Sequence, residues 1–167
     1  MWQVKTVSIP SDDYLSRQKQ KSYFRDALAV PLQHKHLQPD QIQLAIFGYM
    51  PNWVNRMMTV RNKMVAAFGF NTGEGMMPAQ VPNALNEGDR AGFLTVIKKT
   101  DREIISFAQD KHMQFYLSVR KAESQAVVST LVNPTTKIGW LYLQIIRPFH
   151  WLIARSVLHN AAKQQRI

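Results

Sequence analysis

The chain has 167 residues, 46% of them apolar, which is the usual size of one domain with a single core. It contains no cysteine, so disulfides and thiolate metal sites are excluded and stability must come from packing. A formal charge of +10, from 21 basic and 11 acidic residues, favours anionic partners in general. We expect one domain over residues 1–167.

The N-terminus, from Met1 to Pro10, lacks the features of a secretory signal, namely a basic patch, an apolar run and a small-residue cleavage site. We therefore expect a cytoplasmic protein. The most apolar stretch, Ile138 to Leu158, is interrupted by Arg147, His150 and Arg155. Because charged side chains are costly inside a bilayer, this stretch is interpreted as a buried helix.

The N-terminal half is predicted to hold one strand and two helices. Gln3 to Pro10 alternates like a short strand and Asp12 to Asp26 is polar and basic. The short, proline-broken segment from Ala27 to Leu37 is interpreted as a connection or a minor element. A short helix begins at Pro39 and ends before Pro51. A second helix is predicted over Asn52 to Phe68, where apolar residues recur at steps of three or four: Trp53, Met57, Val60, Met64 and Phe68.

The segment from Gly69 to Gly92 is rich in glycine, proline and asparagine and has no sustained period. It is predicted to be a long loop. Loops of this length inside compact domains are often functional, so we expect a lid over a binding site, with Met76 and Met77 as adaptable apolar contacts.

Four strand-like runs with short polar connections predict an antiparallel meander: Phe93 to Lys99, Glu103 to Gln109, His112 to Lys121, and Ala126 to Thr135. The third run alternates most clearly. Phe115 and Leu117 point to one face with Met113 and Val119, while the residues between them point to the other. One face of the sheet should therefore be buried and the other solvated.

The chain ends in a helical pattern from Ile138 to Lys163. Its apolar stripe comprises Leu141, Ile145, Phe149, Leu152 and Ile153, and its opposite side comprises Gln144, Arg147 and Arg155. Pro148 lies inside this pattern and removes one helical hydrogen bond, so a kink or break is predicted near residues 144–147.

Three stretches resemble the motifs of a known family. They are PNWVNRMMTVRN from Pro51 to Asn62 with the later Phe68-Gly69-Phe70, HMQFYLSV from His112 to Val119, and Tyr142 to His150, which ends in RPFH. They resemble a bacterial domain family of unknown function, of the DUF 2867 type, within the START and birch-pollen-allergen superfamily. The resemblance implies an α+β helix-grip fold. In that fold an antiparallel sheet wraps a long C-terminal helix, and two short helices follow the first strand.

We interpret the buried sheet face and the apolar side of the terminal helix as the walls of a ligand pocket. An apolar or amphipathic small molecule would fit between them. The candidate pocket residues are Trp53, Met57, Arg61, Phe115, Leu117, Ile145, Phe149 and His150.

Two of these candidates are polar, and each has two interpretations. Arg61 would pair with an anionic head group if it turns inward, because a planar guanidinium suits that partner, and is a surface charge if it turns outward. His150 is either a hydrogen-bonded structural residue or a polar group at the pocket mouth.

The sequence shows no recognisable catalytic set, cofactor motif or metal site. There is no Gly-x-Ser-x-Gly elbow, and Gly73-Glu-Gly75 lacks the lysine and hydroxyl of a phosphate loop. His34 and His36 have no adjacent third ligand. We expect no catalytic residue, cofactor or metal, and keep an enzyme that uses His150 as a base in the same pocket as a second alternative.

The net charge supports a rival hypothesis, a basic interaction module for an anionic membrane, a nucleic acid or an acidic protein. Trp140 and Trp151 share one side of the last helix with Arg147 and Arg155, a combination that suits a membrane interface or a partner surface. The basic residues are scattered and no nucleic-acid motif is present, so no specific nucleic acid is predicted. The oligomeric state is not determined by these patterns.

Overall fold

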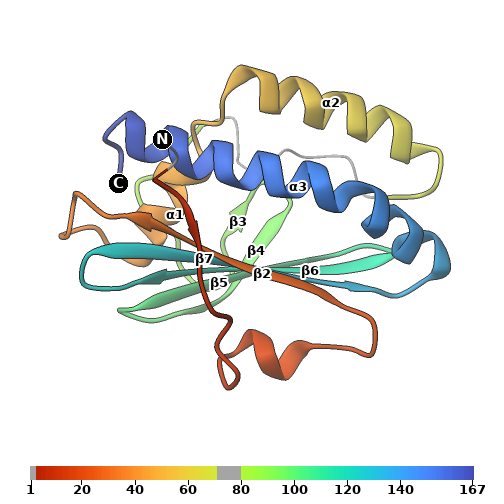
Figure 1. Ribbon diagram of the computed structural model, residues 1–167, viewed down its shortest axis with the longest axis horizontal. Coiled ribbons are helices and arrows are strands. Elements are labelled where there is room, and N and C mark those ends of the chain that lie inside the picture. The colour runs from red at the N-terminus through yellow and green to blue at the C-terminus, as the bar shows by residue number, and fades with distance from the viewer. Residues whose placement is uncertain (1–2, 71–79) are drawn as a thin grey trace.

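The structure is a computed structural model that describes residues 3–70 and 80–167. Within these residues seven strands form one sheet in the order β1-β2-β7-β6-β5-β4-β3, and every neighbouring pair is antiparallel (Figure 1). The strands are β1 (Lys5–Thr6), β2 (Phe24–Pro31), β3 (Arg90–Ala91), β4 (Leu94–Lys99), β5 (Glu103–Gln109), β6 (Met113–Lys121) and β7 (Gln125–Pro134). The helices are η1 (Leu15–Gln18), α1 (Pro39–Phe47), α2 (Asn52–Ala66) and α3 (Lys137–Lys163).

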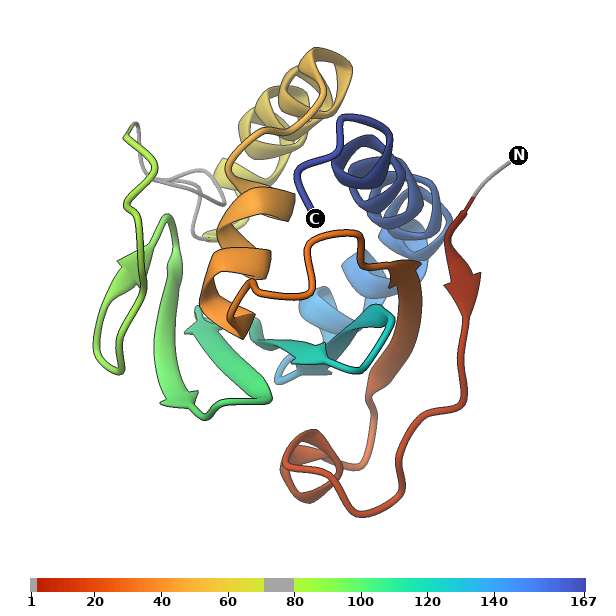
Figure 2. The ribbon, with the colours of Figure 1, turned by 90° about the vertical axis from the view of Figure 1, so that its left-hand side faces the viewer.

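Helices α1 and α3 pack on one face of the curved sheet, and η1 lies beyond its opposite face (Figure 2). The main core joins Leu117 and Val119 of β6 to Val157 and Leu158 of α3, with Ile42 of α1 in the same cluster. These side chains are nearly completely buried, so the hydrophobic effect holds the helices to the sheet. The predicted α+β, helix-grip arrangement is confirmed.

The largest difference from the predicted elements is β2. We interpreted Ala27 to Leu37 as a connection or a minor element and predicted no strand before it. In the structure Phe24–Pro31 forms an eight-residue strand between β1 and β7. The prediction was wrong because Arg25 and Asp26 are charged and Pro31 ends the run, which hides the alternation. The other elements of the sheet lie close to their predicted positions, except that β1 is limited to Lys5–Thr6 and β3 forms at the end of the segment predicted to be a loop.

The two faces of β6 differ less in their burial than we predicted. Phe115, Leu117 and Val119 belong to the main core, as expected. On the other face Tyr116 is buried against Leu15 of η1. That face is therefore not simply solvated, because the η1 segment covers part of it.

Arg25 of β2 anchors the η1 segment to this outer face. Its guanidinium forms an ion pair with Asp13 and also donates a 2.8 Å hydrogen bond to the hydroxyl of Ser16. The Arg25 and Asp13 side chains are only 1% and 5% exposed. An ion pair buried to this degree needs all of its partners, so the segment and the sheet are expected to be ordered together.

Helix α3 runs as one element from Lys137 to Lys163 and continues through Pro148. The prediction of a break near the proline was therefore wrong. Thr136 caps its N-terminus by accepting a 3.1 Å hydrogen bond from the amide of Gly139. None of the helices in the described part of the chain has the length and the apolar character that crossing a bilayer requires.

Most of the apolar stripe predicted for α3 faces away from the sheet, whereas its last member, Ile153, packs against the main core. Ile145 and Phe149 are 60% and 46% exposed, and Leu152 is also exposed. The buried side instead carries Gly139, Leu143, Val157, Leu158, Ala161 and Ala162. Small residues let the helix approach closely: a Cβ on Gly139 would lie 2.2 Å from the carbonyl oxygen of His112. Because the small residues allow this close approach, this side of α3 packs against the sheet and the bulkier side faces outward.

Helix α2 is attached to the rest of the domain by its buried residues Val54 and Val65 and by Met58, which packs against the main core. Most of the apolar residues predicted to share one face of this helix are on the surface: Trp53, Val60, Met64 and Phe68 are exposed. Part of the predicted loop, with Met76 and Met77, lies outside the described residues. Residues 80–89 contain no helix or strand. A lid function for the loop stays a prediction.

Candidate functional site

A hydrogen-bonding contact between a side chain of a strand and a side chain of a helix marks the candidate site. The Nε2 atom of His150 on α3 lies 3.1 Å from Oδ2 of Asp26 on β2. The ring of Phe24 stands edge-on to the His150 ring, with centroids 5.3 Å apart. Phe24 and Asp26 are two residues apart on β2 and therefore project from the same face of the strand, toward α3.

Around this pair a cleft of about 350 Å³ opens between β2 and α3. We call it the β2–α3 cleft. It is lined by Thr6, Phe24, Asp26, Leu28, Arg147, Pro148, His150, Trp151 and Arg155. Aromatic and aliphatic side chains thus share the walls with two guanidinium groups, one carboxylate and an imidazole.

The two arginines of the cleft lie against aromatic rings. The guanidinium carbon of Arg147 is 5.1 Å from the centre of the Phe24 ring, and that of Arg155 is 4.3 Å from the Trp151 ring. Arg155 also donates a hydrogen bond to the hydroxyl of Thr6 on β1. Within residues 3–70 and 80–167 neither guanidinium forms an ion pair with a carboxylate. Both can therefore accept an anion from solution.

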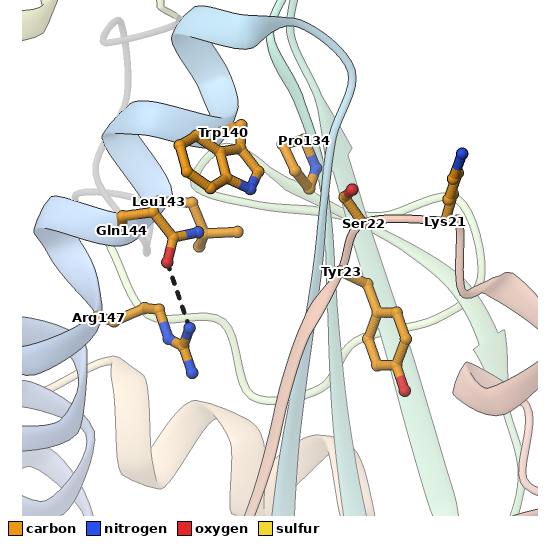
Figure 3. Close-up of a pocket in the computed structure, with 8 residues that line it drawn as sticks. All are labelled: Lys21, Ser22, Tyr23, Pro134, Trp140, Leu143, Gln144 and Arg147. Atoms are coloured by element: carbon orange, nitrogen blue, oxygen red, sulfur yellow. Dashed lines mark hydrogen bonds between the residues drawn. The ribbon is translucent and has the colours of Figure 1, made fainter.

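A second hollow, of about 330 Å³, continues along α3 toward its N-terminus. Its lining comprises Lys21, Ser22, Tyr23, Pro134, Trp140, Leu143, Gln144 and Arg147. Figure 3 shows Trp140, Gln144 and Arg147 projecting from α3 across from Ser22 and Tyr23, and Arg147 donates a 3.3 Å hydrogen bond to Gln144. Arg147 lines both hollows, so a ligand in either one would meet its guanidinium.

The residues predicted to line one pocket are placed in three different regions. Leu117 is 2% exposed and Phe115 packs against Phe93 with ring centres 5.9 Å apart, so both belong to the core. Ile145 and Phe149 lie on the outer side of α3. The predicted geometry, in which the Ile145 and Phe149 side of α3 faces β6, is therefore wrong, because the Val157 and Leu158 side fills that space.

The candidates on α2 also lie outside the cleft. Trp53 is exposed and Met57 is half-buried. Arg61 turns toward α3, where its Nε donates a 2.6 Å hydrogen bond to the hydroxyl of Tyr142. Of the eight candidates, His150 is the one found among the residues that line the β2–α3 cleft.

Sequence reasoning missed Asp26 and Phe24 because β2 was not predicted. The arginines were found, since Arg147, Trp151 and Arg155 are spaced four residues apart and share one side of α3, but we assigned that side to a membrane or partner surface and not to the pocket. Among the described residues no group of three potential metal ligands lies together. His34 instead contacts the ring of His36 and the carbonyl of Gln165.

Comparison with known proteins gives a family and no function. Residues 19–157 match the model of a family described as "Protein of unknown function (DUF2867)". No curated protein and no solved structure matches the chain.

Proposed function

We propose, from the premise that the chain belongs to the DUF2867 family of unknown function, that it is a binding domain for a small amphipathic anion held in the β2–α3 cleft. The observation that carries this proposal is the pair of guanidinium groups, Arg147 and Arg155, stacked on aromatic walls without carboxylate partners among the described residues. A cytoplasmic location is part of the same proposal.

The size and chemistry of the cleft support a small ligand. A volume of about 350 Å³ is near the lower end for small-molecule sites, which span roughly 300–1,000 Å³. Phe24 and Trp151 offer flat apolar contacts, while a guanidinium binds a carboxylate, sulfonate or phosphate with two parallel hydrogen bonds. A flat hydrophobic body with one acidic group fits both features.

The helix-grip arrangement also agrees with this proposal. The sequence resembles the START and birch-pollen-allergen superfamily, in which ligands occupy the space between the sheet and the terminal helix. Here the central part of that space is filled by core side chains such as Leu117 and Leu158, so the proposed ligand lies at the β2 side of α3. The fold alone assigns no chemistry, and the cleft residues carry the argument.

Thermal unfolding in the presence of aromatic and aliphatic carboxylates and sulfonates tests the proposal. A ligand that binds the folded protein raises the melting temperature according to its concentration and dissociation constant. The double variant Arg147→Gln, Arg155→Gln should weaken the affinity by at least about tenfold, since each lost charged contact contributes roughly 1–3 kcal/mol. The matched control is Arg102→Gln, on an exposed turn between β4 and β5.

The proposal fails if none of these anions changes the melting temperature of the native protein. It also fails if the shift persists unchanged in the double variant.

A second candidate function is catalysis in the same cleft, and the His150–Asp26 pair is the observation that favours it. A carboxylate that holds one nitrogen of an imidazole fixes its tautomer, which is how many general bases are oriented. Replacing His150 by Ala should then abolish turnover of a bound ligand while binding persists. Mass spectrometry of the ligand after incubation with both proteins distinguishes a substrate, which changes in mass, from a ligand that does not.

A further inference from the structure

Two rows of large apolar side chains remain on the surface where α2 and α3 lie side by side (Figure 1). Met64 and Phe68 are 63% and 60% exposed at the C-terminal end of α2, while Ile138, Ile145 and Phe149 are 47%, 60% and 46% exposed on α3. We call these five residues, together with the half-buried Met57, the α2–α3 face. Exposed apolar patches larger than a few hundred Å² generally mark interaction sites.

One contact shows that the two rows face each other's helix. Arg61 on α2 donates a 2.6 Å hydrogen bond to Tyr142 on α3, and its guanidinium carbon lies 5.3 Å from the Tyr142 ring centre. Side chains three, four or seven positions along a helix lie on the same side. On α2, Met57 lies four positions before Arg61 and Met64 three positions after it, and Phe68 follows at the seventh position in the next turn. On α3, Ile138 lies four positions before Tyr142, and Ile145 and Phe149 lie three and seven positions after it. The two rows therefore form one continuous surface.

The charged residues of α2 and α3 have a single sign. Neither helix contains an aspartate or a glutamate in its 15 or 27 residues. Their cationic residues are Arg56, Arg61, Lys63, Lys137, Arg147, Arg155 and Lys163. An apolar face on two helices whose charged residues are all cationic attracts a partner that has acidic groups above an apolar interior.

We propose that the α2–α3 face docks on a lipid bilayer that contains anionic phospholipids, with its aliphatic and aromatic side chains inserted below the head groups. Trp53 supports a bilayer in particular. It lies four positions before Met57, on the same side of α2, and is 38% exposed. Tryptophan is enriched at the depth of the lipid head groups, where its ring is apolar and its N–H meets water.

The composition of the face disfavours a nucleic acid. Ile138, Ile145 and Met64 are aliphatic side chains without a flat ring for base stacking or a group that binds phosphate. The insertion of such residues into an acyl layer, by contrast, contributes favourable free energy in proportion to the buried area. The proposal is independent of the ligand of the β2–α3 cleft.

Vesicle flotation with the full chain tests the proposal. Vesicles of phosphatidylcholine alone are compared with vesicles that also contain phosphatidylglycerol, each at low and high salt. The native protein should float with the anionic vesicles, bind the neutral ones only weakly, and lose affinity as salt rises. Tryptophan emission should shift to the blue on binding, because indole rings leave water.

Two variants separate the apolar and the charged contributions. Ile145→Ser with Phe149→Ser should lower the affinity for anionic vesicles by roughly a hundredfold. Arg56→Gln with Lys63→Gln should lower it by roughly tenfold and reduce the salt dependence. The matched controls are Ile9→Ser with Ile97→Ser and Lys98→Gln with Arg102→Gln, which change exposed residues outside α2 and α3 and should bind like the native protein.

Three results would overturn the proposal. One is the absence of native protein from the floated anionic vesicles at low salt. Another is unchanged binding after Ile145→Ser with Phe149→Ser in a variant whose circular dichroism is native, since the face would then not take part. The third is a dimer in light scattering that dissociates on the same substitutions without vesicle binding, which would assign the face to a second copy of the chain.

Discussion

Arg61 of α2 and Tyr142 of α3 are joined by a hydrogen bond of 2.6 Å from the guanidinium Nε to the phenolic oxygen. The apolar side chains that also hold α2 are the buried Val54 and Val65 and the half-buried Met58, which packs against the main core. The orientation of α2, and with it the α2–α3 face, therefore depends strongly on this pair.

Tyr142→Phe removes the hydroxyl acceptor and keeps the ring under the guanidinium. We expect the free energy of unfolding to fall by about 1–2 kcal/mol, the usual loss for a hydrogen bond with a charged partner that is half-buried. Urea unfolding followed by fluorescence measures the change. Tyr23→Phe, an exposed tyrosine far from α2, is the control and should leave the midpoint in place. Equal midpoints for both variants would mean that the pair does not hold α2.

The buried pair of Arg25 and Asp13 should make the protein sensitive to acid. Burial alone would raise the pKa of Asp13, but the hydrogen bonds from Arg25 and Ser16 outweigh it and hold the pKa below its ordinary value of 3.8. A carboxyl with a depressed folded-state pKa adds stability that is fully present above the unfolded pKa and is lost as the pH falls through the folded one.

Asp13→Asn tests this relationship directly. At neutral pH the free energy of unfolding should fall by about 3 kcal/mol, because the buried Arg25 charge loses its partner. The variant should also lose less stability on acidification than the native protein, since Asn does not titrate. Urea unfolding at several pH values measures both effects, and the exposed neighbour change Asp12→Asn is the control. A variant with an unaltered acid transition would rule out Asp13 as its origin.

Gly139→Ala should be strongly destabilising although alanine is the better helix former by about 1 kcal/mol. The added Cβ would lie 2.2 Å from the carbonyl oxygen of His112, so α3 or the start of β6 must move. We expect a loss of about 2–3 kcal/mol, as in other overpacked sites. Calorimetry measures it, with Ile138→Ala on the exposed side of the same turn as the control. A melting temperature at or above that of the native protein would contradict the close packing of α3.

Asp26→Asn should affect the cleft more than the fold. The His150 and Asp26 side chains are 24% and 20% exposed, so their contact contributes at most about 1 kcal/mol to stability. Removal of the carboxylate leaves the cations of the β2–α3 cleft, and the affinity for an anionic ligand should rise by roughly threefold to tenfold. Calorimetric titration at low salt measures it, with Asp101→Asn as a distant control. A weaker affinity would instead show that Asp26 takes part in ligand binding.

Most elements of the fold could be predicted because their signals are local. The alternation in β6 and the steps of three and four in α2 and α3 are visible in short windows of sequence, and the corresponding strand and helices lie where they were expected. Strand β2 could not be found in this way. Its inward-facing row of Phe24, Leu28 and Val30 is interrupted by the charged Asp26, whose partner in the structure, His150, lies on the last helix of the chain.

The candidate site depended on information that no local window holds. His150 and Asp26 are 124 positions apart, and their contact requires β2 to lie beside α3. Periodicity identified the apolar stripes of α2 and α3 but not the direction in which they point. A stripe shows which side chains share a face, and the shape of the partner decides whether that face is buried.

The amino-acid sequence by itself determined the order of strands and helices, the antiparallel meander and the two apolar helical rows, because each follows from spacing along the chain. Only the tertiary structure decided that the small residues Gly139, Ala161 and Ala162 turn toward the sheet while Ile145 and Phe149 turn outward. The physical reason is that close packing rewards the side that can approach the sheet most nearly, and the bulkier apolar side is then left for a partner.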